Sequence, residues 1–111
     1  MPRIRSIKPQ TLPTVQEPAF FECCLYLICE SDGHLTKVGI AKHVHRRLMA
    51  LQCGNPRPLS IAACYEGSRK DCLEVERAVL KRFVANVERS EWLRTNPANI
   101  KQFIAEVANE A

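Results

Sequence analysis

The chain has 111 residues, of which 46% are apolar and 25% are charged, and its formal net charge is +4. Such a length and composition predict one small globular domain with a modest core. They argue against a multidomain protein, and no apolar stretch is long enough to span a membrane.

The first half of the chain predicts an arm followed by a hairpin and a helix. Residues 1–18 are basic, contain four prolines and lack periodicity, so we expect a flexible or loosely docked arm before a single domain over residues 19–111. The nearly all-apolar run Phe20–Cys29 predicts a strand buried on both faces. A turn and a second strand, Leu35–Ile40, complete a hairpin. A helix is expected over Lys42–Leu51.

The second half predicts one more strand and two helices. Leu59–Glu66 has Leu59, Ile61, Ala63 and Tyr65 at alternate positions, which predicts a third strand. Ser68 is expected to cap a long helix that ends near Val84, and Asn96 with Pro97 begins a final helix. The predicted fold class is α/β (α+β), with a small three-stranded antiparallel sheet flanked by helices in the order β-β-α-β-α-α.

One carboxylate falls within the apolar arc of the long helix. Projection at 100° per residue places Glu76 between Leu80 and Phe83. A buried carboxylate needs a cationic partner, because leaving water costs several kcal/mol. The partner is an Arg, a Lys or a metal ion, and a plain internal ion pair remains an alternative.

Arg47 is a candidate for that partner or for a separate role. It lies at the edge of the apolar stripe of its helix, whereas Arg46 points away from the stripe and should be solvated. Arg47 can therefore bury its aliphatic stem and present its guanidinium at the boundary of the core. We expect both helices to face one sheet.

The predicted hairpin contributes two further polar residues. Tyr26 in the buried strand must direct its hydroxyl to a hydrogen-bond partner or a cleft. Lys37 precedes Gly39 in the paired strand, and a glycine there leaves space for the close approach of a backbone or a ligand. Taken alone, Lys37 is also compatible with a surface position at the sheet edge.

Positive charge is concentrated between Asp32 and Glu66, where no acidic residue occurs. Clustered cations favour a polyanionic partner, most commonly nucleic acid, although a solvated basic face without a partner is the simpler alternative. The residues that we expect to contact nucleic acid are Lys42, His43, Arg46 and Arg57.

The six cysteines are expected to be reduced. No signal peptide is visible, and a disulfide framework is typical of secreted chains. Cys29, Cys53, Cys64 and Cys72 lie within apolar patterns and are interpreted as core residues. A cytoplasmic location follows from this interpretation.

The motifs resemble those of the GIY-YIG nuclease superfamily. Leu25-Tyr26-Leu27-Ile28 and Lys37-Val38-Gly39 resemble its paired strands, Arg47 its helical arginine, and Glu76 its metal-binding glutamate. The closest resemblance is to the subgroup known as meiotically up-regulated gene 113, which is related to a phage-type domain. Further matching segments lie between Leu25 and Val107: Lys37-Val38-Gly39-Ile40-Ala41, Arg47-Leu48-Met49-Ala50-Leu51-Gln52, Asn55-Pro56-Arg57-Pro58-Leu59, Glu76 to Phe83, and Glu91-Trp92-Leu93.

The resemblance implies a metal-dependent endonuclease that acts on nucleic acid, with DNA as the expected partner. Glu76 would hold one Mg²⁺ or Mn²⁺, Arg47 would hold the scissile phosphate, and Tyr26 would accept a proton from the attacking water with Lys37 nearby. These residues form the implied catalytic set: Tyr26, Lys37, Arg47 and Glu76.

Two alternatives remain open from the sequence. Ile40 and Leu80 stand where a Lys and a His are common in the superfamily, which favours a catalytically weak or inactive nucleic-acid-binding module. An internal ion pair between Arg47 and Glu76 in a structural protein would need no nucleic acid at all. Cleavage and binding assays separate the three hypotheses.

Overall fold

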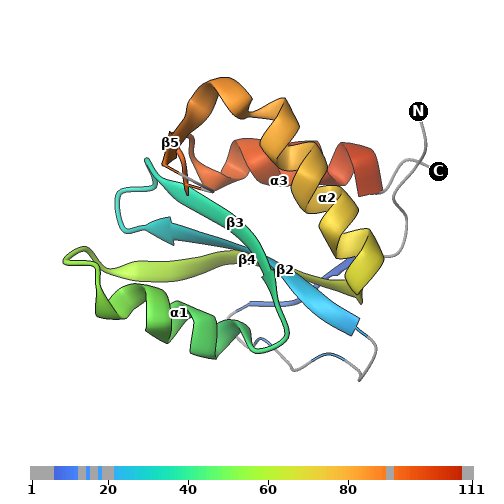
Figure 1. Cartoon of the computed structure of the whole chain (residues 1–111), viewed down its shortest axis with the longest axis horizontal. Helices are drawn as coiled ribbons and strands as arrows, with labels where there is room; N and C mark the ends of the chain where they lie inside the picture. Colours follow the sequence, from blue (N-terminus) through green and yellow to red (C-terminus); the bar gives the residue numbers. More distant parts are fainter. Residues whose placement is uncertain (1–6, 13–14, 16–17, 19–21, 90–91, 109–111) are drawn as a thin grey trace.

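A computed structural model describes residues 7–12, 15, 18, 22–89 and 92–108. An antiparallel sheet lies between α1 on one side and α2 with α3 on the other (Figure 1). The predicted α+β class is confirmed. The elements are β1 (Lys8–Pro9), β2 (Glu22–Glu30), β3 (Thr36–Ala41), α1 (Val44–Cys53), β4 (Leu59–Ser68), α2 (Arg69–Arg82), a 3₁₀ turn (Val84–Asn86), β5 (Val87–Arg89), β6 (Trp92–Leu93) and α3 (Pro97–Ala108).

The strand β2 lies inside the sheet, as its apolar sequence predicts. The strand order is β1-β4-β2-β3-β6-β5, and every pairing is antiparallel. The residues of β2 from Cys23 to Ile28 are all buried. The predicted hairpin with β3 is also present, and its turn includes Gly33 at a φ of 75°, a conformation that glycine adopts without steric cost.

Alternate side chains of β2 enter two separate cores. Leu25 and Leu27 pack with residues of α2 and α3, whereas Tyr26 and Ile28 pack with Val44 of α1. This alternation follows from the period of a strand, in which successive side chains point to opposite faces. The helices α1 and α2 therefore face one sheet, as expected, and they cover its opposite faces.

The predicted count of three strands is wrong, because the sheet formed by the described residues has six. The additional strands β1, β5 and β6 contain only two or three residues each. Segments this short show no measurable hydrophobic alternation, so periodicity cannot reveal them. They form by pairing with the edges of the longer strands.

Part of the predicted N-terminal arm lies against the domain. Lys8 and Pro9 pair with β4, and the neighbouring Ile7 is 3% exposed within the core on the α2 and α3 side. Residues 1–6, 13–14 and 16–17 of the arm lie outside the described part of the chain.

Two side chains define the boundaries of the helices. The hydroxyl of Ser68 accepts a hydrogen bond from the backbone N–H of Asp71, which confirms the predicted cap of α2. In the last turn of α1, Gln52 donates to the carbonyls of Asn55 and Arg57 and accepts from the N–H of Leu59. Its amide thus holds the turn that leads into β4.

All six cysteines are free thiols. Cys64 and Cys72 are buried as expected, but Cys53 at the end of α1 is exposed, so its placement in the core is wrong. At 100° per residue, Cys53 lies about 180° from Val44 around α1, so it points away from the packed stripe. No helix in the described part of the chain is both long enough and apolar enough to cross a membrane.

Candidate active site

Tyr26 is the innermost of the predicted site residues. Its side chain is 1% exposed on the α1 face of the sheet, and its cross-strand partner is Gly39 of β3. A Cβ atom at Gly39 would overlap the Tyr26 hydroxyl and lie 2.6 Å from its Cζ. The glycine is therefore needed for close approach, as predicted, and the group that fills the space is the tyrosine ring.

Arg47 joins the tyrosine from the second turn of α1. Its Nε donates a hydrogen bond to the Tyr26 hydroxyl oxygen at 3.3 Å. The residue as a whole is exposed, so the predicted half-buried position is wrong. Only Val44 of α1 is fully buried, with Leu48 and Leu51 partly so, which leaves Arg47 at the rim of the helix contact. The guanidinium still contacts the core through the phenol.

Lys37 lies on the same face of β3 as Gly39, because the two residues are separated by one position of the strand. It is only 6% exposed, and its cross-strand neighbours are Ile28 and Trp92. Its Nζ is 6.0 Å from the centroid of the Trp92 ring, at the limit of a cation–π contact. The surface position considered for Lys37 at the sheet edge is not observed.

Trp92, which the sequence indicates only through a quoted motif, also belongs to this region. Its ring packs with the core on the α1 side, next to Lys37, and is partly exposed. The short strand β6 carries too few residues to reveal which face Trp92 occupies. Its place in the quoted Glu91-Trp92-Leu93 motif was the only available signal.

Glu76 belongs to the opposite layer of the fold. It is partly exposed in the middle of α2, between Val75 and Val79, which are fully buried against the other face of the sheet. Between the two layers lies the strand β3, which pairs with β6 only at Thr36 and Lys37 within the described residues. The helix that carries Glu76 thus lies on the face of the sheet opposite to Tyr26 and α1.

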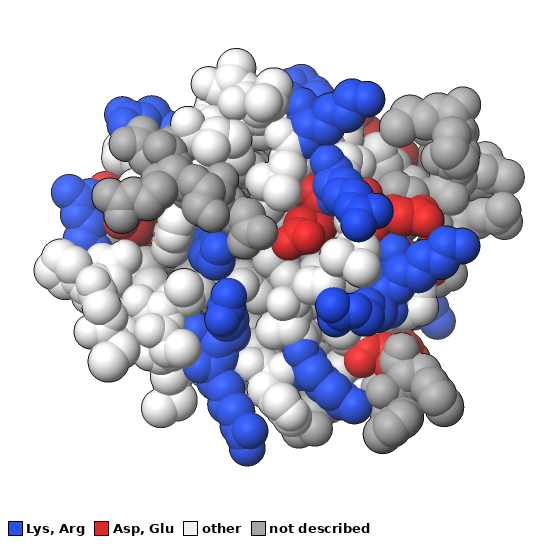
Figure 2. Space-filling view, in the orientation of Figure 1, with Lys and Arg blue, Asp and Glu red and all other residues white. Residues whose placement is uncertain are grey.

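The basic residues fall into two groups. Lys42 and His43 lie between the end of β3 and the start of α1, and Arg46 is exposed on α1. Figure 2 shows Lys and Arg side chains gathered over α1, the edge of the sheet and α2, around a smaller group of acidic side chains.

Arg57 lies at the other end of the sheet. Its Nη1 is 3.3 Å from a carboxylate oxygen of Glu30 and 3.3 Å from one of Asp32. Glu30 is cross-strand from Leu59, whereas the β3 end near Lys42 pairs with the start of β2. The structure therefore does not bring Arg57 together with the other predicted nucleic-acid contacts.

The donor set of the site is sparse in acids. The described residues contain no group of three or more His, Cys, Asp or Glu side chains arranged to hold a metal ion. Glu76 is the one carboxylate in the predicted catalytic set. A cation here would need oxygen ligands from water and from a bound substrate.

One family matches most of the chain: the T5orf172 domain matches residues 23–108. The matched range includes Tyr26, Lys37, Arg47 and Glu76. No curated protein and no solved structure matches the chain at a significant level.

Proposed function

This chain belongs to the T5orf172 domain family, a nuclease-related group, and on that premise we propose that it is a metal-dependent endonuclease acting on nucleic acid. The reaction is hydrolysis of a phosphodiester bond. The proposed catalytic residues are Tyr26, Lys37, Arg47 and Glu76.

The hydrogen bond between Arg47 Nε and the Tyr26 hydroxyl is the observation that carries the proposal. Two motif residues from separate elements, α1 and β2, are held in direct contact where the sheet carries a glycine to admit them. A core tyrosine needs a hydrogen-bond partner for its hydroxyl. An exposed arginine is an unusual partner, because ordering its long side chain costs conformational entropy. The contact has a functional reason if it orients the guanidinium to bind a phosphate.

Arg47 supplies the charge for that phosphate. A guanidinium presents several N–H donors in one plane, so it can hold a phosphate oxygen while Nε remains on Tyr26. Fixed donors aimed at developing negative charge are among the largest contributions to catalysis. Lys37, buried on the same face of β3 as Gly39, would add positive charge to this side of the sheet.

Tyr26 would accept the proton of the attacking water or orient that water. Because the side chain is 1% exposed, side chains around it must move before water reaches its hydroxyl. Binding of a phosphate by the terminal nitrogens of Arg47 would accompany this movement, while Nε keeps its bond to Tyr26. Substrate binding and exposure of the phenol are thereby linked.

Glu76 is the proposed ligand of one Mg²⁺ or Mn²⁺ ion. Magnesium is often bound by one or two carboxylates together with substrate phosphates and waters, so one glutamate is compatible with a cation that binds together with substrate. The ion would stabilise negative charge on the phosphate oxygens. Weak binding of the metal without nucleic acid is the expected consequence.

Three finer assignments belong to the same proposal. DNA is the proposed nucleic acid, and the subgroup of meiotically up-regulated gene 113 is the proposed nearest relative within the superfamily. The proposed location is the cytoplasm, where a reducing environment keeps thiols free.

A catalytically inactive nucleic-acid-binding module is the second candidate. The burial of Tyr26 beneath Arg47 and the single carboxylate of the catalytic set favour it. In that case the same basic face would hold nucleic acid without cleaving it.

A plasmid-nicking assay separates the two candidates. We expect conversion of supercoiled plasmid to nicked circles with Mg²⁺ or Mn²⁺, and none with EDTA or with the Glu76→Gln variant. Binding without nicking in either metal, measured across a range of salt concentrations, would establish the binding module instead. Failure of the protein to bind any DNA or RNA at low salt would contradict both.

A further inference from the structure

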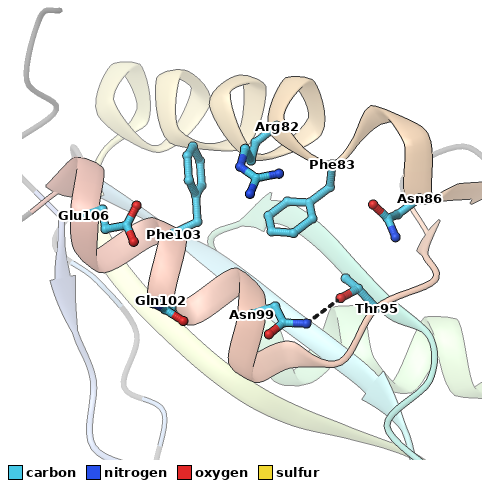
Figure 3. A pocket seen from close by; sticks show the side chains of 8 residues that line it. All are labelled: Arg82, Phe83, Asn86, Thr95, Asn99, Gln102, Phe103 and Glu106. Atoms are coloured by element: carbon cyan, nitrogen blue, oxygen red, sulfur yellow. Dashed lines mark hydrogen bonds between the residues drawn. The ribbon is translucent and has the colours of Figure 1, made fainter.

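A concave surface lies between the C-terminal end of α2 and α3. It encloses about 350 Å³, within the range of small-molecule sites. It is on the side of the sheet opposite to α1 and Tyr26. Its lining residues, drawn in Figure 3, are Arg82, Phe83, Asn86, Thr95, Asn99, Gln102, Phe103 and Glu106.

The floor of this cavity is aromatic. The rings of Phe83 and Phe103 meet edge to face with centroids 6.0 Å apart. The guanidinium of Arg82 lies over the Phe83 ring, 5.2 Å from its centroid, and projects from α2 toward α3 (Figure 3). A planar cation stacked on an aromatic ring is held in one orientation, and its other face is available to a flat ligand.

The walls carry polar groups of both kinds. Among the described residues, neither Gln102 nor Glu106 has a hydrogen bond or ion pair, and Arg82 has no ion-pair partner. Asn99 uses its amide nitrogen on the Thr95 hydroxyl at 3.1 Å, which directs that amide along the wall (Figure 3). A cation, a carboxylate and amides around one aromatic floor suit a flat ligand with its own donors, acceptors and negative charge.

We propose that this cavity binds a single guanine nucleotide unit, either free or within a strand of nucleic acid. The phosphate would lie at Arg82. The N1–H and N2–H donors of guanine form a pair that matches the two oxygens of Glu106. The side-chain amides of Asn99 and Gln102 would form hydrogen bonds with the remaining polar atoms of the base.

The choice of a nucleotide over other flat polar ligands rests on the proposed nucleic-acid function. The position of the cavity makes it a separate site, because the sheet lies between it and the Arg47–Tyr26 contact. It would therefore select or anchor a nucleotide at a distance from the cleavage chemistry. Thymine and uracil lack the amino group that the carboxylate requires, so they should bind less well.

The test is a titration of the ¹⁵N-labelled full chain, without metal, followed by chemical shifts. The probes are guanosine 5′-monophosphate and thymidine 5′-monophosphate. We expect the guanine nucleotide to perturb Asn99, Gln102 and Phe103 and to bind at least about fivefold tighter than the thymine nucleotide, the lower end of one base-edge contact. Equal affinities, or perturbations confined to α1, would overturn the proposal.

The Glu106→Gln variant distinguishes specific binding of the guanine base from non-specific electrostatic attraction of the nucleotide. Removing an acid raises the positive charge of the protein, so non-specific binding of a nucleotide should become stronger. The proposal requires weaker binding of the guanine nucleotide instead. Arg82→Gln should weaken the nucleotide more than guanosine, and Lys81→Gln is the matched control, since Lys81 lies on the same helix but does not line the cavity. Tighter binding in Glu106→Gln would refute the assignment.

The source of the nucleotide is resolved with the pentanucleotides d(TTGTT) and d(TTTTT). Preference for d(TTGTT) assigns the site to a strand, and preference for the monophosphate alone assigns it to a free nucleotide. Arg47→Ala and Glu76→Ala should retain guanine binding. If these variants bind guanine and the native protein cleaves no nucleic acid, the proposed nuclease function fails and the nucleotide site stands. If the native protein cleaves nucleic acid but does not bind guanine, the nucleotide site fails and the nuclease function stands.

Discussion

The guanidinium of Arg47 lies against the hydroxyl of Tyr26, and this contact joins the rim of α1 to a buried side chain of the sheet. Nε is the donor, and a lysine ammonium cannot reproduce a donor partway along a planar group. The contact therefore depends on the identity of residue 47 as well as on its charge.

Replacing Arg47 tests whether the contact serves cleavage. We expect Arg47→Lys and Arg47→Ala each to lower the rate of plasmid nicking by about 10²-fold or more, as for loss of one fixed donor at a developing charge. The measurement is nicking under single-turnover conditions. Far-UV circular dichroism should stay native, because Arg47 is exposed.

The neighbouring Arg46→Ala variant is the matched control, since Arg46 is also exposed on α1 but has no contact with Tyr26. Its nicking rate should fall less than that of Arg47→Lys. Equal losses in the two variants would mean that the charge of the helix matters and that the contact does not.

Gly39→Ala should destabilise the protein because its Cβ would overlap the Tyr26 hydroxyl. We expect a loss of about 1–3 kcal/mol in the free energy of unfolding, typical of overpacking, measured by urea denaturation. Introduced into the Tyr26→Phe variant, the same change should cost less, because the overlapping oxygen is gone.

The control for this substitution is Gly54→Ala. Gly54 has a φ of −103°, and no atom lies within 4 Å of a Cβ at this position, so the substitution should be close to neutral. A neutral Gly39→Ala variant would show that the ring of Tyr26 moves easily, which would contradict its role as a fixed part of the site.

The long elements were predictable from the sequence because each carries its own signal. The apolar run of β2, the turn at Gly33 and the cap at Ser68 act over neighbouring residues, and all were found as expected. The contact between Tyr26 and Arg47 was not predicted as such. Both residues were identified, but the hydrogen bond depends on the packing of α1 across the hairpin.

What the sequence could not reveal depends on pairing between distant segments. The strands β1 and β6 exist only through their partners, and Trp92 lies next to Lys37 because β6 adds to the edge of β3. The helical wheel of α2 located Glu76 beside apolar residues but carried no information about which face of the sheet α2 covers. The assignment of Glu76 to the site stays a prediction.

The role of Glu76 can be tested against a carboxylate of the same helix. Glu76→Gln should abolish nicking supported by Mg²⁺ or Mn²⁺, because it removes the one acid in the proposed metal site. Glu74→Gln, which is also partly exposed on α2, should leave nicking within about twofold of the native rate, as is usual for substitutions outside a site. Similar activity in the two variants would exclude Glu76 as the metal ligand.

Buried thiols predict a loss of stability in alkaline solution. Burial raises the pKa of the thiols of Cys23 and Cys72 above their ordinary value of 9.0. Below pH 9 these thiols are neutral in both states and their contribution is complete. Above it the unfolded chain loses the protons first, so unfolding becomes more favourable as pH rises through the folded pKa.

The measurement is the free energy of unfolding in urea between pH 8 and pH 10.5, with a reductant present. Each such thiol contributes a slope of up to about 1.4 kcal/mol per pH unit in this window. Cys72→Ala should therefore show a shallower decline than the native protein. The exposed Cys53→Ala serves as the control and should follow the native curve; a native curve that is flat to pH 10.5 would contradict the prediction.

The two groups of basic residues should differ in how they affect nucleic-acid binding. Arg46 is exposed on α1 near Lys42, whereas Arg57 contacts Glu30 and Asp32 at the other end of the sheet. Each phosphate contact contributes about one unit to the slope of log K against log salt. Arg46→Gln should reduce that slope by about one, and Arg57→Gln should leave it unchanged.

Arg57→Gln has its own expected effect on stability. An ion pair of an exposed arginine contributes roughly 0–1 kcal/mol, and Glu30, at 7% exposed, would lose its cationic partner. We therefore expect a small fall in the unfolding free energy without a change in salt dependence. If Arg57→Gln lowers the salt slope as much as Arg46→Gln, the phosphate backbone extends along the whole length of α1, and the contact surface is larger than the structure implies.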